Sequence, residues 1–150
     1  MTNVYLSNSN SGNTLTNNTI TFNEGYGLKL WAAYSNNIYN NLLNNNNNVV
    51  LKSVNGNKWN TTKISGLNII GSHYIGGNFW GDPTGTGFSQ TCTDAYSDGI
   101  CDSSYNISVN DIDFLPLAYN SAITSTPTPT TLSPEVEAWD TNHDGNNPEE

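Results

Sequence analysis

The stretch NTLTNNTITFN (13–23) returns 23 residues later as NNIYNNLLNNN (36–46). Apolar residues and asparagines coincide in this alignment: Leu15 with Ile38, Ile20 with Leu43, Asn17–Asn18 with Asn40–Asn41, and Asn23 with Asn46. The tripeptide VYL (4–6) matches LKL (28–30) at a shift of 24 residues, and VVL (49–51) continues the series at a shift of 21. A repeat of about 20–25 residues indicates a solenoid in which each repeat stacks on its neighbours.

Apolar residues within each repeat alternate with polar ones, as in Leu28-x-Leu30 and Val49-x-Leu51. This period of two predicts strands of three to five residues and excludes the helical segment of a leucine-rich repeat. The chain is therefore predicted to be all-β, a parallel β-helix of about three to four coils over residues 1–81. The alternative is a disordered Asn-rich tract, which the shared register of the apolar positions disfavours.

Asparagine is the most abundant signal, with 27 residues of which 16 fall in the first 50 positions. Asn tolerates left-handed backbone and satisfies turns, so it suits corners between short strands. Asn residues at equivalent corners are also expected to form ladders of side-chain amides, as stacked Asn does in other parallel sheets.

Charge is divided unevenly along the chain. Residues 1–81 carry four Lys and one acid, whereas residues 82–150 carry twelve acids and no cation, and the chain has no Arg. No basic patch is available to bind the phosphates of a nucleic acid. No apolar run of about 20 residues is present to span a membrane. The chain enters a strand-like run directly, so we expect it to be a piece of a longer protein.

Several motifs resemble the right-handed parallel β-helix repeats of NosD-like and pectate-lyase-like surface proteins of archaeal type. The repeat motifs are NNTI, EGYGLKLW, SNNIYNN and LNNNNN, and the more specific ending contains IGGNFWGD (75–82), SDGICD (97–102), YNI (105–107) and DIDFLPL (111–117). The resemblance covers residues 4–118 and implies a right-handed β-helix with a C-terminal cap at 82–119. In that family the aspartate loop resembles a calcium loop. This chain departs from it at Tyr96, where Asp is expected, and at Cys101, where Gly is expected.

The loop TDAYSDGICD (93–102) places three carboxylates within nine residues and has no Lys or Arg near it in sequence. Calcium binds six to eight oxygen ligands in flexible geometry, and Gly99 allows the backbone to turn between the acids. We therefore predict a calcium site, with a solvated acidic loop as the alternative and zinc disfavoured. The predicted ligands are Asp94, Asp98, Asp102, the carbonyl of Ile100, and Asp82, with Asp111 and Asp113 as further candidates.

Cys92 and Cys101 are the only two cysteines; Cys92 stands just before this loop and Cys101 lies inside it. Two cysteines suggest one disulfide and hence an oxidising, extracellular setting. Such a bridge would hold the predicted ligands together; two buried free thiols are the alternative.

The C-terminal segment reads as a linker followed by an acidic tail. Residues 120–134 are rich in Ser, Thr and Pro and are predicted to be disordered. Residues 135–150 contain a partial calcium-loop motif with Asp140, Asn142 and Asp144 as predicted ligands. Its later ligand positions are occupied by Pro148 or lie past residue 150. Predicted N-glycosylation sequons begin at Asn17, Asn60 and Asn106.

Aromatic residues are expected to cover the end of the solenoid. Phe79 and Trp80 are predicted to cap the C-terminal end, where Trp59, Phe114 and Leu115 could join them. The N-terminal end, entered at Val4, carries no such cover, which predicts association with another coil or another copy. Four aromatics at strand ends or turns could instead stack on sugar rings, although capping or surface packing is favoured. They are Tyr26, Trp31, Tyr34 and Tyr39.

These observations predict an extracellular structural protein of a cell surface, a sheath or a self-assembling filament, stabilised by calcium and without enzymatic activity. The alternative is a carbohydrate-binding or adhesion module, which a row of aromatics on one exposed face would favour. A polysaccharide lyase is disfavoured because residues 1–81 offer one acid and no Arg. Copper delivery is disfavoured because His73 and His143 are far apart in sequence and both cysteines are assigned to a disulfide.

Overall fold

The computed structural model describes residues 3–7 and 11–119 and contains almost only strands. The all-β prediction is confirmed: twelve short strands and one four-residue helix are present in these residues. The predicted linker and acidic tail lie outside the described residues. No described helix is long and apolar enough to cross a membrane.

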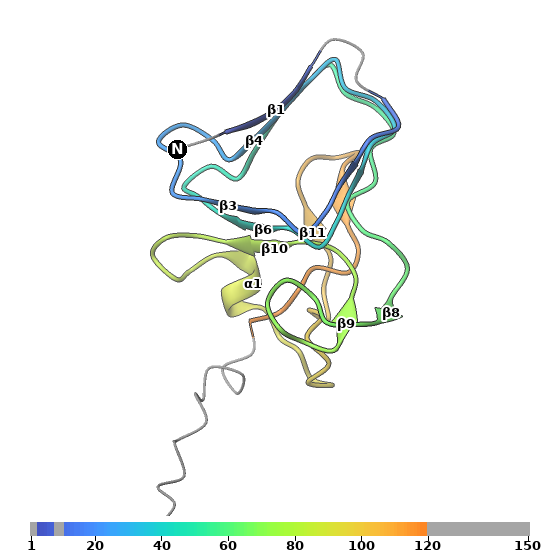
Figure 1. Cartoon of the computed structure of the whole chain (residues 1–150). Helices are drawn as coiled ribbons and strands as arrows, with labels where there is room; N and C mark the ends of the chain where they lie inside the picture. The colour runs from blue at the N-terminus through green and yellow to red at the C-terminus, as the bar shows by residue number, and fades with distance from the viewer. Residues whose placement is uncertain (1–2, 8–10, 120–150) are drawn as a thin grey trace, which may run out of the picture.

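Three parallel sheets are built from strands of successive repeats (Figure 1). One contains β1 (Val4–Ser7), β4 (Leu28–Trp31) and β7 (Val49–Lys52); another contains β3 (Thr19–Thr21), β6 (Leu42–Asn44) and β10 (Phe79–Gly81); the third pairs β2 (Thr14–Leu15) with β5 (Asn37–Ile38). We call residues 4–23, 28–45 and 49–81 the first, second and third repeats. Parallel pairing of consecutive repeats is the arrangement that a parallel β-helix requires, and the handedness and number of coils stay predictions.

The strand register reproduces the sequence alignment. Leu15 pairs with Ile38 and Ile20 with Leu43 at the shift of 23. Val4 pairs with Leu28 at a shift of 24, and Leu28 pairs with Val49 at a shift of 21. One detail was wrong: the side chain of Asn23 bonds Asn45 rather than Asn46. The corner after β6 is two residues shorter than the corner after β3, so the shift between equivalent residues falls from 23 to 21 across it. Asn45 lies in this corner, at a shift of 22 from Asn23.

Inward-facing residues of the strands form the main core. Leu28, Leu30, Ile38 and Leu43 are fully buried in the second repeat. Their counterparts in the first repeat, Val4, Leu6 and Leu15, are only half-buried, while Ile20 is buried. The stack is therefore better covered in its middle than at its N-terminal face.

The third repeat is interrupted before its last strand. A short antiparallel hairpin, β8 (Ile64–Ser65) with β9 (Tyr74–Ile75), projects from it before the chain returns to the sheet at β10. The segment after β10 forms α1 (Phe88–Thr91), which packs on β10, and an antiparallel pair of β11 (Tyr105–Asn106) with β12 (Ile112–Asp113). This ending covers the third repeat.

Three Asn ladders join the repeats, as predicted from the composition. They run Asn13–Asn36–Asn57, Asn18–Asn41–Asn78 and Asn23–Asn45–Asn48, where the Asn45–Asn48 step lies within one corner rather than between repeats. At every step the side-chain oxygen of the later Asn accepts two hydrogen bonds, one from the backbone N–H and one from the side-chain amide of the earlier Asn. Each ladder therefore has a direction, with donors toward the N-terminal end and acceptors toward the C-terminal end of every step.

Left-handed backbone accounts for Asn at one of the corners, whereas Ser, Ala, Phe or Gly adopts this conformation at the others. Asn17 and Asn40 occupy equivalent corners with φ of 60° and 54°, directly before the second ladder. Asn adopts this conformation at lower cost than most residues. Here the two side chains also bond each other, since Asn40 Nδ2 donates to Asn17 Oδ1.

Candidate functional site

The aspartate loop is closed by the predicted disulfide between Cys92 and Cys101. Inside it, the carboxylate of Asp94 accepts the backbone N–H groups of Asp98 (3.1 Å) and Gly99 (2.8 Å). Asp98 accepts the N–H of Ile100 at 2.9 Å, and Asp102 accepts the N–H of Ala95 at 3.1 Å. The three carboxylates thus fold the loop by binding its own backbone.

A cation does approach this loop, but it is a side chain that the sequence places 35 residues away. Lys63, at the base of the β8–β9 hairpin, forms an ion pair and a hydrogen bond with Asp98. The hydrogen bond with Asp98 raises the pKa of Lys63. The repulsion among the acids is therefore relieved by backbone donors and by Lys63.

The predicted calcium site is not supported by this geometry. Residues 3–7 and 11–119 contain no group of three or more acidic, His or Cys side chains that could hold a metal. Ile100 packs into a second apolar cluster with Phe79 and Leu117, and Asp82 instead binds Thr84, whose hydroxyl and N–H lower the pKa of Asp82. The spacing of the acids predicts a ligand set, but loop carboxylates that accept backbone N–H groups have the same spacing. Asp140, Asn142 and Asp144 lie outside the described residues.

Asp113 has the most distinctive environment among the described acids. It is fully buried, and its Oδ2 accepts the backbone N–H of Asn78 (2.7 Å), the Asn78 amide (3.4 Å) and the indole N–H of Trp80 (2.9 Å). Its Oδ1 accepts the N–H of Leu115 at 3.1 Å. Asp113 therefore occupies the position of the next rung in the Asn18–Asn41–Asn78 ladder. Because a carboxylate only accepts, the ladder ends there.

Gly77 makes room for this rung. A Cβ at position 77 would lie 1.8 Å from Asp113 Oδ1, and one at Gly76 would lie 2.9 Å from the carbonyl oxygen of Leu115. The motifs IGGNFWGD (75–82) and DIDFLPL (111–117) are thus one physical unit, in which glycines admit Asp113 beside Asn78 and Trp80. Both motifs are recognisable in the sequence, but their contact is not predicted by it.

A second buried acid supports the neighbouring tryptophan. Asp111 accepts the indole N–H of Trp59 at 3.0 Å and the hydroxyl of Ser108 at 2.8 Å. Trp59 and Trp80 have ring centroids 5.8 Å apart, and Trp80 lies 4.6 Å from Tyr105. Asp111 and Asp113, which were candidate metal ligands, hold the indoles of the core instead.

The predicted aromatic cover is only partly correct. Trp80 and Trp59 belong to the main core, whereas Phe79 and the half-buried Leu115 pack in the second cluster. Phe114 joins neither cluster because its side chain is 63% exposed. Tyr105 and Phe88, with ring centroids 5.1 Å apart, pack against the main core from the ending.

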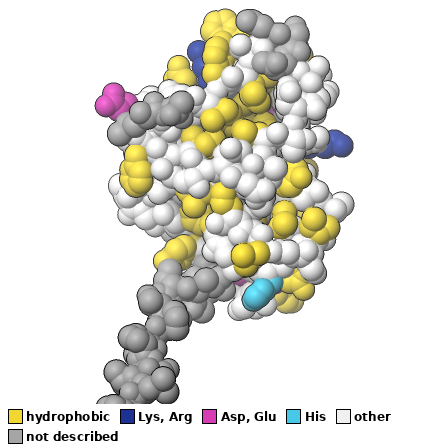
Figure 2. All heavy atoms as spheres, viewed as in Figure 1, with side chains coloured by type: hydrophobic (Ala, Val, Ile, Leu, Met, Phe, Trp, Pro, Cys, Tyr) yellow, Lys and Arg dark blue, Asp and Glu magenta, His cyan; other side chains and the backbone are white. Residues whose placement is uncertain are grey.

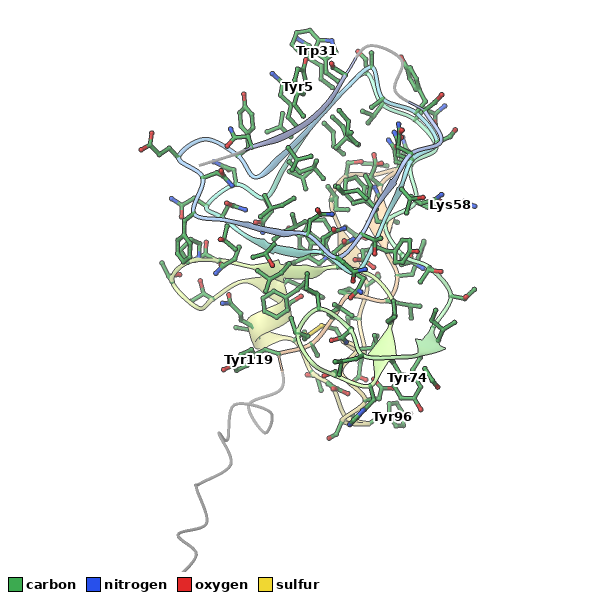
Figure 3. The ribbon with its side chains drawn as sticks, viewed as in Figure 1. Tyr5, Trp31, Lys58, Tyr74, Tyr96 and Tyr119 are labelled. Atoms are coloured by element: carbon green, nitrogen blue, oxygen red, sulfur yellow. A yellow bond between two sulfur atoms is a disulfide. The ribbon has the colours of Figure 1, made fainter. Side chains whose placement is uncertain are left out.

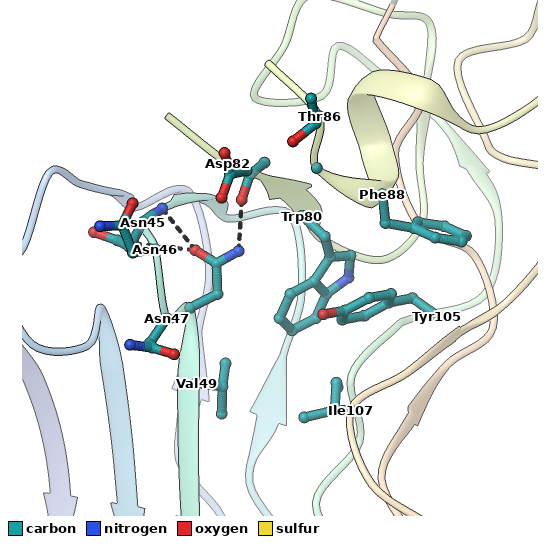
Figure 4. A pocket seen from close by; sticks show the side chains of 13 residues that line it. Asn45, Asn46, Asn47, Val49, Trp80, Asp82, Thr86, Phe88, Tyr105 and Ile107 are labelled. Carbon is teal, nitrogen blue, oxygen red and sulfur yellow. Dashed lines mark hydrogen bonds between the residues drawn. The ribbon is translucent and has the colours of Figure 1, made fainter. Parts of the chain in front are cut away.

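A cleft of about 330 Å³ opens where the Asn45–Asn48 corner meets the ending (Figure 4). Asn48 donates to the carbonyl of Gly81 at 2.7 Å and accepts from the N–H of Asn45 at 2.9 Å. Trp80, Phe88 and Tyr105 form the aromatic wall. The lining has amides, one carboxylate and no cation, so it suits a small neutral polar molecule better than an anion.

Aromatic and Lys side chains gather on the outer face of the β1–β4–β7 sheet. Lys29 lies 5.1 Å from the ring centroid of Tyr5, 5.6 Å from that of Tyr26 and 5.0 Å from that of Trp31. Lys52 lies 4.3 Å from the ring of Trp31. We call these five residues the outer lysine face; Figure 3 labels Tyr5 and Trp31 at the end of the molecule farthest from the hairpin.

The glycosylation sequons differ in accessibility. Asn17 and Asn106 are exposed, whereas Asn60 is half-buried. The Asn60 amide donates to the carbonyl of Thr61 and its oxygen accepts from the N–H of Phe114. Glycosylation stays a prediction for all three; Asn106 lies exposed in β11, whereas the side-chain oxygen of Asn17 accepts a hydrogen bond from Asn40.

Short parallel strands stacked in register and joined by Asn ladders define a β-helix repeat protein. The family model described as periplasmic copper-binding protein (NosD) matches residues 2–85, and the chain belongs to this family. The resemblance drawn from the repeats is thereby confirmed. No curated protein and no solved structure matches the chain.

The copper named in the family description does not fit the described residues of this chain. Copper prefers clustered His, Met or Cys ligands. Both cysteines are bonded to each other, and His73 is the one histidine among residues 3–7 and 11–119, which contain no group able to hold a metal.

Proposed function

We propose that the protein is a non-enzymatic structural module of the cell surface that closes one end of a β-helix stack. The disulfide and the periplasmic description of the family support an extracellular or periplasmic location. The proposal rests on a contrast between the two ends of the stack. At the C-terminal end the Asn18–Asn41–Asn78 ladder is terminated by Asp113, whereas at the N-terminal end the first rung of the Asn23–Asn45 ladder presents an acceptor.

The acceptor end is most evident at Asn23. Its side chain is 5% exposed, and among the described residues its Oδ1 has no hydrogen-bond partner. Burying an acceptor without a partner costs about 1–3 kcal/mol. In the ladders, this oxygen receives the N–H and the amide of the preceding rung. A stacked coil with Asn at that position would supply both donors.

The same face is apolar as well as rich in acceptors. Val4, Leu6 and Leu15 are half-buried, whereas the residues beneath them in the second repeat are fully buried. The occupant that fits is therefore another β-helical coil with inward apolar residues and Asn donors. The closed end of a second copy fits this face less well, because the Asn78 donors at that end are already bound to Asp113. Assembly into a sheath or filament, calcium stabilisation and lack of enzymatic activity remain parts of the proposal to be tested.

The test adds one coil. A copy of residues 4–27 inserted before Val4 should raise the melting temperature, since solenoid stability grows with each interface between repeats. The matched control is an insertion of the same composition in scrambled order, which should leave the melting temperature unchanged. Equal melting temperatures for both insertions would overturn the proposal, and electron microscopy of the parent chain tests separately whether it assembles into filaments.

A second candidate function is glycan binding. It is favoured by the exposed aromatics of the outer lysine face, since aromatic rings supply flat apolar contact area. Screening the protein on a glycan array tests this candidate independently of stacking.

A further inference from the structure

We propose that the outer lysine face binds an acidic polysaccharide, with sugar rings stacked on Trp31 and Tyr5 and carboxylates paired with Lys29 and Lys52. This inference rests on the second candidate function and specifies its ligand class. It goes beyond the closing of a stack, which concerns the ends of the strands rather than their outer face.

Strand register determines the layout of the face. Leu28 and Leu30 point into the core, so Lys29 and Trp31 point outward from β4. Tyr5 pairs with Lys29 across β1 and β4, and Trp31 pairs with Lys52 across β4 and β7. Neighbouring strands lie about 4.8 Å apart, so the three strands span about 10 Å of flat surface. This is a platform for a chain molecule laid across the strands.

Both aromatics remain accessible although they contact lysines. Tyr5 is 51% exposed and Trp31 is 39% exposed. In the view of Figure 2, a Lys side chain lies among hydrophobic side chains at the end of the molecule where Figure 3 labels Tyr5 and Trp31. A sugar ring needs such an apolar ring face on one side and polar groups at its edge.

The lysines specify an acid. The one ion pair among the described residues is Lys63–Asp98, so Lys29 and Lys52 have no carboxylate partner there. Glu24 is the single acid in residues 1–81. The cation–π contacts hold both ammonium groups over the rings without neutralising their charge. A carboxylate on the sugar would form ion pairs with Lys29 and Lys52.

The negative net charge of the chain does not oppose this. All acids except Glu24 lie after residue 81, in the ending and the tail. At physiological ionic strength the screening length is about 8 Å, so the local charge of the sheet governs binding.

The experiment measures binding of the full chain to three immobilised polymers in buffer with EDTA. Alginate carries uronic-acid rings, dextran carries neutral rings, and polyglutamate carries carboxylates without rings. Alginate should bind best, and its affinity should fall as salt is raised. Trp31→Ala and the double variant Lys29→Gln/Lys52→Gln should each weaken alginate binding about tenfold, which corresponds to about one lost contact of ordinary strength.

Matched controls use similar residues away from the face. Tyr96→Ala removes an aromatic side chain that is 84% exposed, and Lys58→Gln removes an exposed lysine that Figure 3 places on a different side. Both should bind alginate within twofold of the parent. Melting temperatures of all variants establish that they fold.

Three outcomes overturn the inference. Equal binding of dextran and alginate removes the acid specificity, although loss of both with Trp31→Ala would still support glycan binding. Equal binding of polyglutamate indicates a surface that recognises charge alone. Equal losses in the control variants indicate non-specific association. None of these outcomes bears on the stacked coil, which the insertion test addresses.

Discussion

The repeats and the ending use different side chains to accept the hydrogen bonds of the preceding Asn rung. In the Asn18–Asn41–Asn78 ladder of the repeats, the middle rung is an Asn, which accepts from the rung before it and donates to the rung after it. In the ending, the rung after Asn78 is Asp113, which accepts four hydrogen bonds and passes none on. An amide propagates the stack and a carboxylate stops it. The difference of one functional group therefore separates the body of the solenoid from its end.

The strongest way to break this comparison is to remove the terminating rung. Asp113→Ala leaves the N–H groups of Asn78 and Leu115 and the indole of Trp80 without acceptors in a buried site. Each orphaned donor costs about 1–3 kcal/mol, so we expect a loss of about 4 kcal/mol in the free energy of unfolding. Urea denaturation measures it. The control Asp102→Ala, at an exposed loop acid, should cost less than about 1 kcal/mol. Equal losses would show that Asp113 is not a special rung.

Filling the space beside the rung should have the next largest effect. Gly77→Ala places a methyl group 1.8 Å from Asp113 Oδ1, which forces the strand or the ending to move. We expect a loss of about 3 kcal/mol, at the upper end of overpacking costs. Gly25→Ala is the matched control, since a Cβ there meets nothing within 4 Å and its φ is not in the left-handed region. That variant should be neutral or slightly stabilising.

The charge of Asp113 predicts a pH dependence that neutral rungs cannot have. Burial raises the pKa of Asp113 from 3.8 to about 6, against the opposing effect of its hydrogen-bond donors. The folded state then holds the proton more tightly than the unfolded chain. The protonated carboxyl of Asp113 therefore stabilises the fold, and this stabilisation is fully present below pH 3.8 and is lost as the pH rises through about 6. Its size is about 3 kcal/mol at 1.36 kcal/mol per pKa unit.

The variant Asp113→Asn isolates this contribution, because an amide does not titrate. Denaturation series from pH 4 to 7 should show that the variant lacks the decline attributed to Asp113. A parent protein whose stability rises across this range relative to the variant would mean that the four donors outweigh burial.

The smallest predicted effect comes from removing a rung in the body. Asn41→Ala deletes the amide contacts with Leu15, Tyr39 and Asn78 and the acceptor of Asn18. We expect a loss of about 2 kcal/mol, because several neutral hydrogen bonds are lost but the core remains. Asn46→Ala, at an exposed corner position, should change the unfolding free energy by less than about 0.5 kcal/mol in thermal or urea melts.

Local periodicity in the sequence predicted the repeats because each pairing is with the next repeat. Leu15 and Ile20 find their partners at a fixed shift, and the same shift predicts the Asn13–Asn36 and Asn18–Asn41 steps of the ladders. The contacts that the sequence could not predict lack such a period. Asp113 reaches Asn78 from 35 residues away, and Lys63 reaches Asp98 across the same separation. The β8–β9 hairpin interrupts the third repeat and has no counterpart among the described residues of the first two.

The same absence of periodicity explains why the sequence could not distinguish a calcium loop from a loop that its own backbone satisfies. Its three carboxylates have the spacing of metal ligands, but this spacing equally serves Asx-type turns in which a carboxylate binds backbone N–H groups. Only the placement of Lys63 and of the loop amides distinguishes the two arrangements.

The one-way order of the ladders has a consequence for how such a chain can change its length. Each rung recognises only the rung that follows it, through one oxygen and two donors. A whole repeat could therefore be duplicated or deleted between existing repeats without any change to Gly77, Asn78 or Asp113. Unequal recombination within such an Asn-rich coding region would yield longer or shorter proteins that all keep the same finished end, so length can vary over generations while closure is inherited intact.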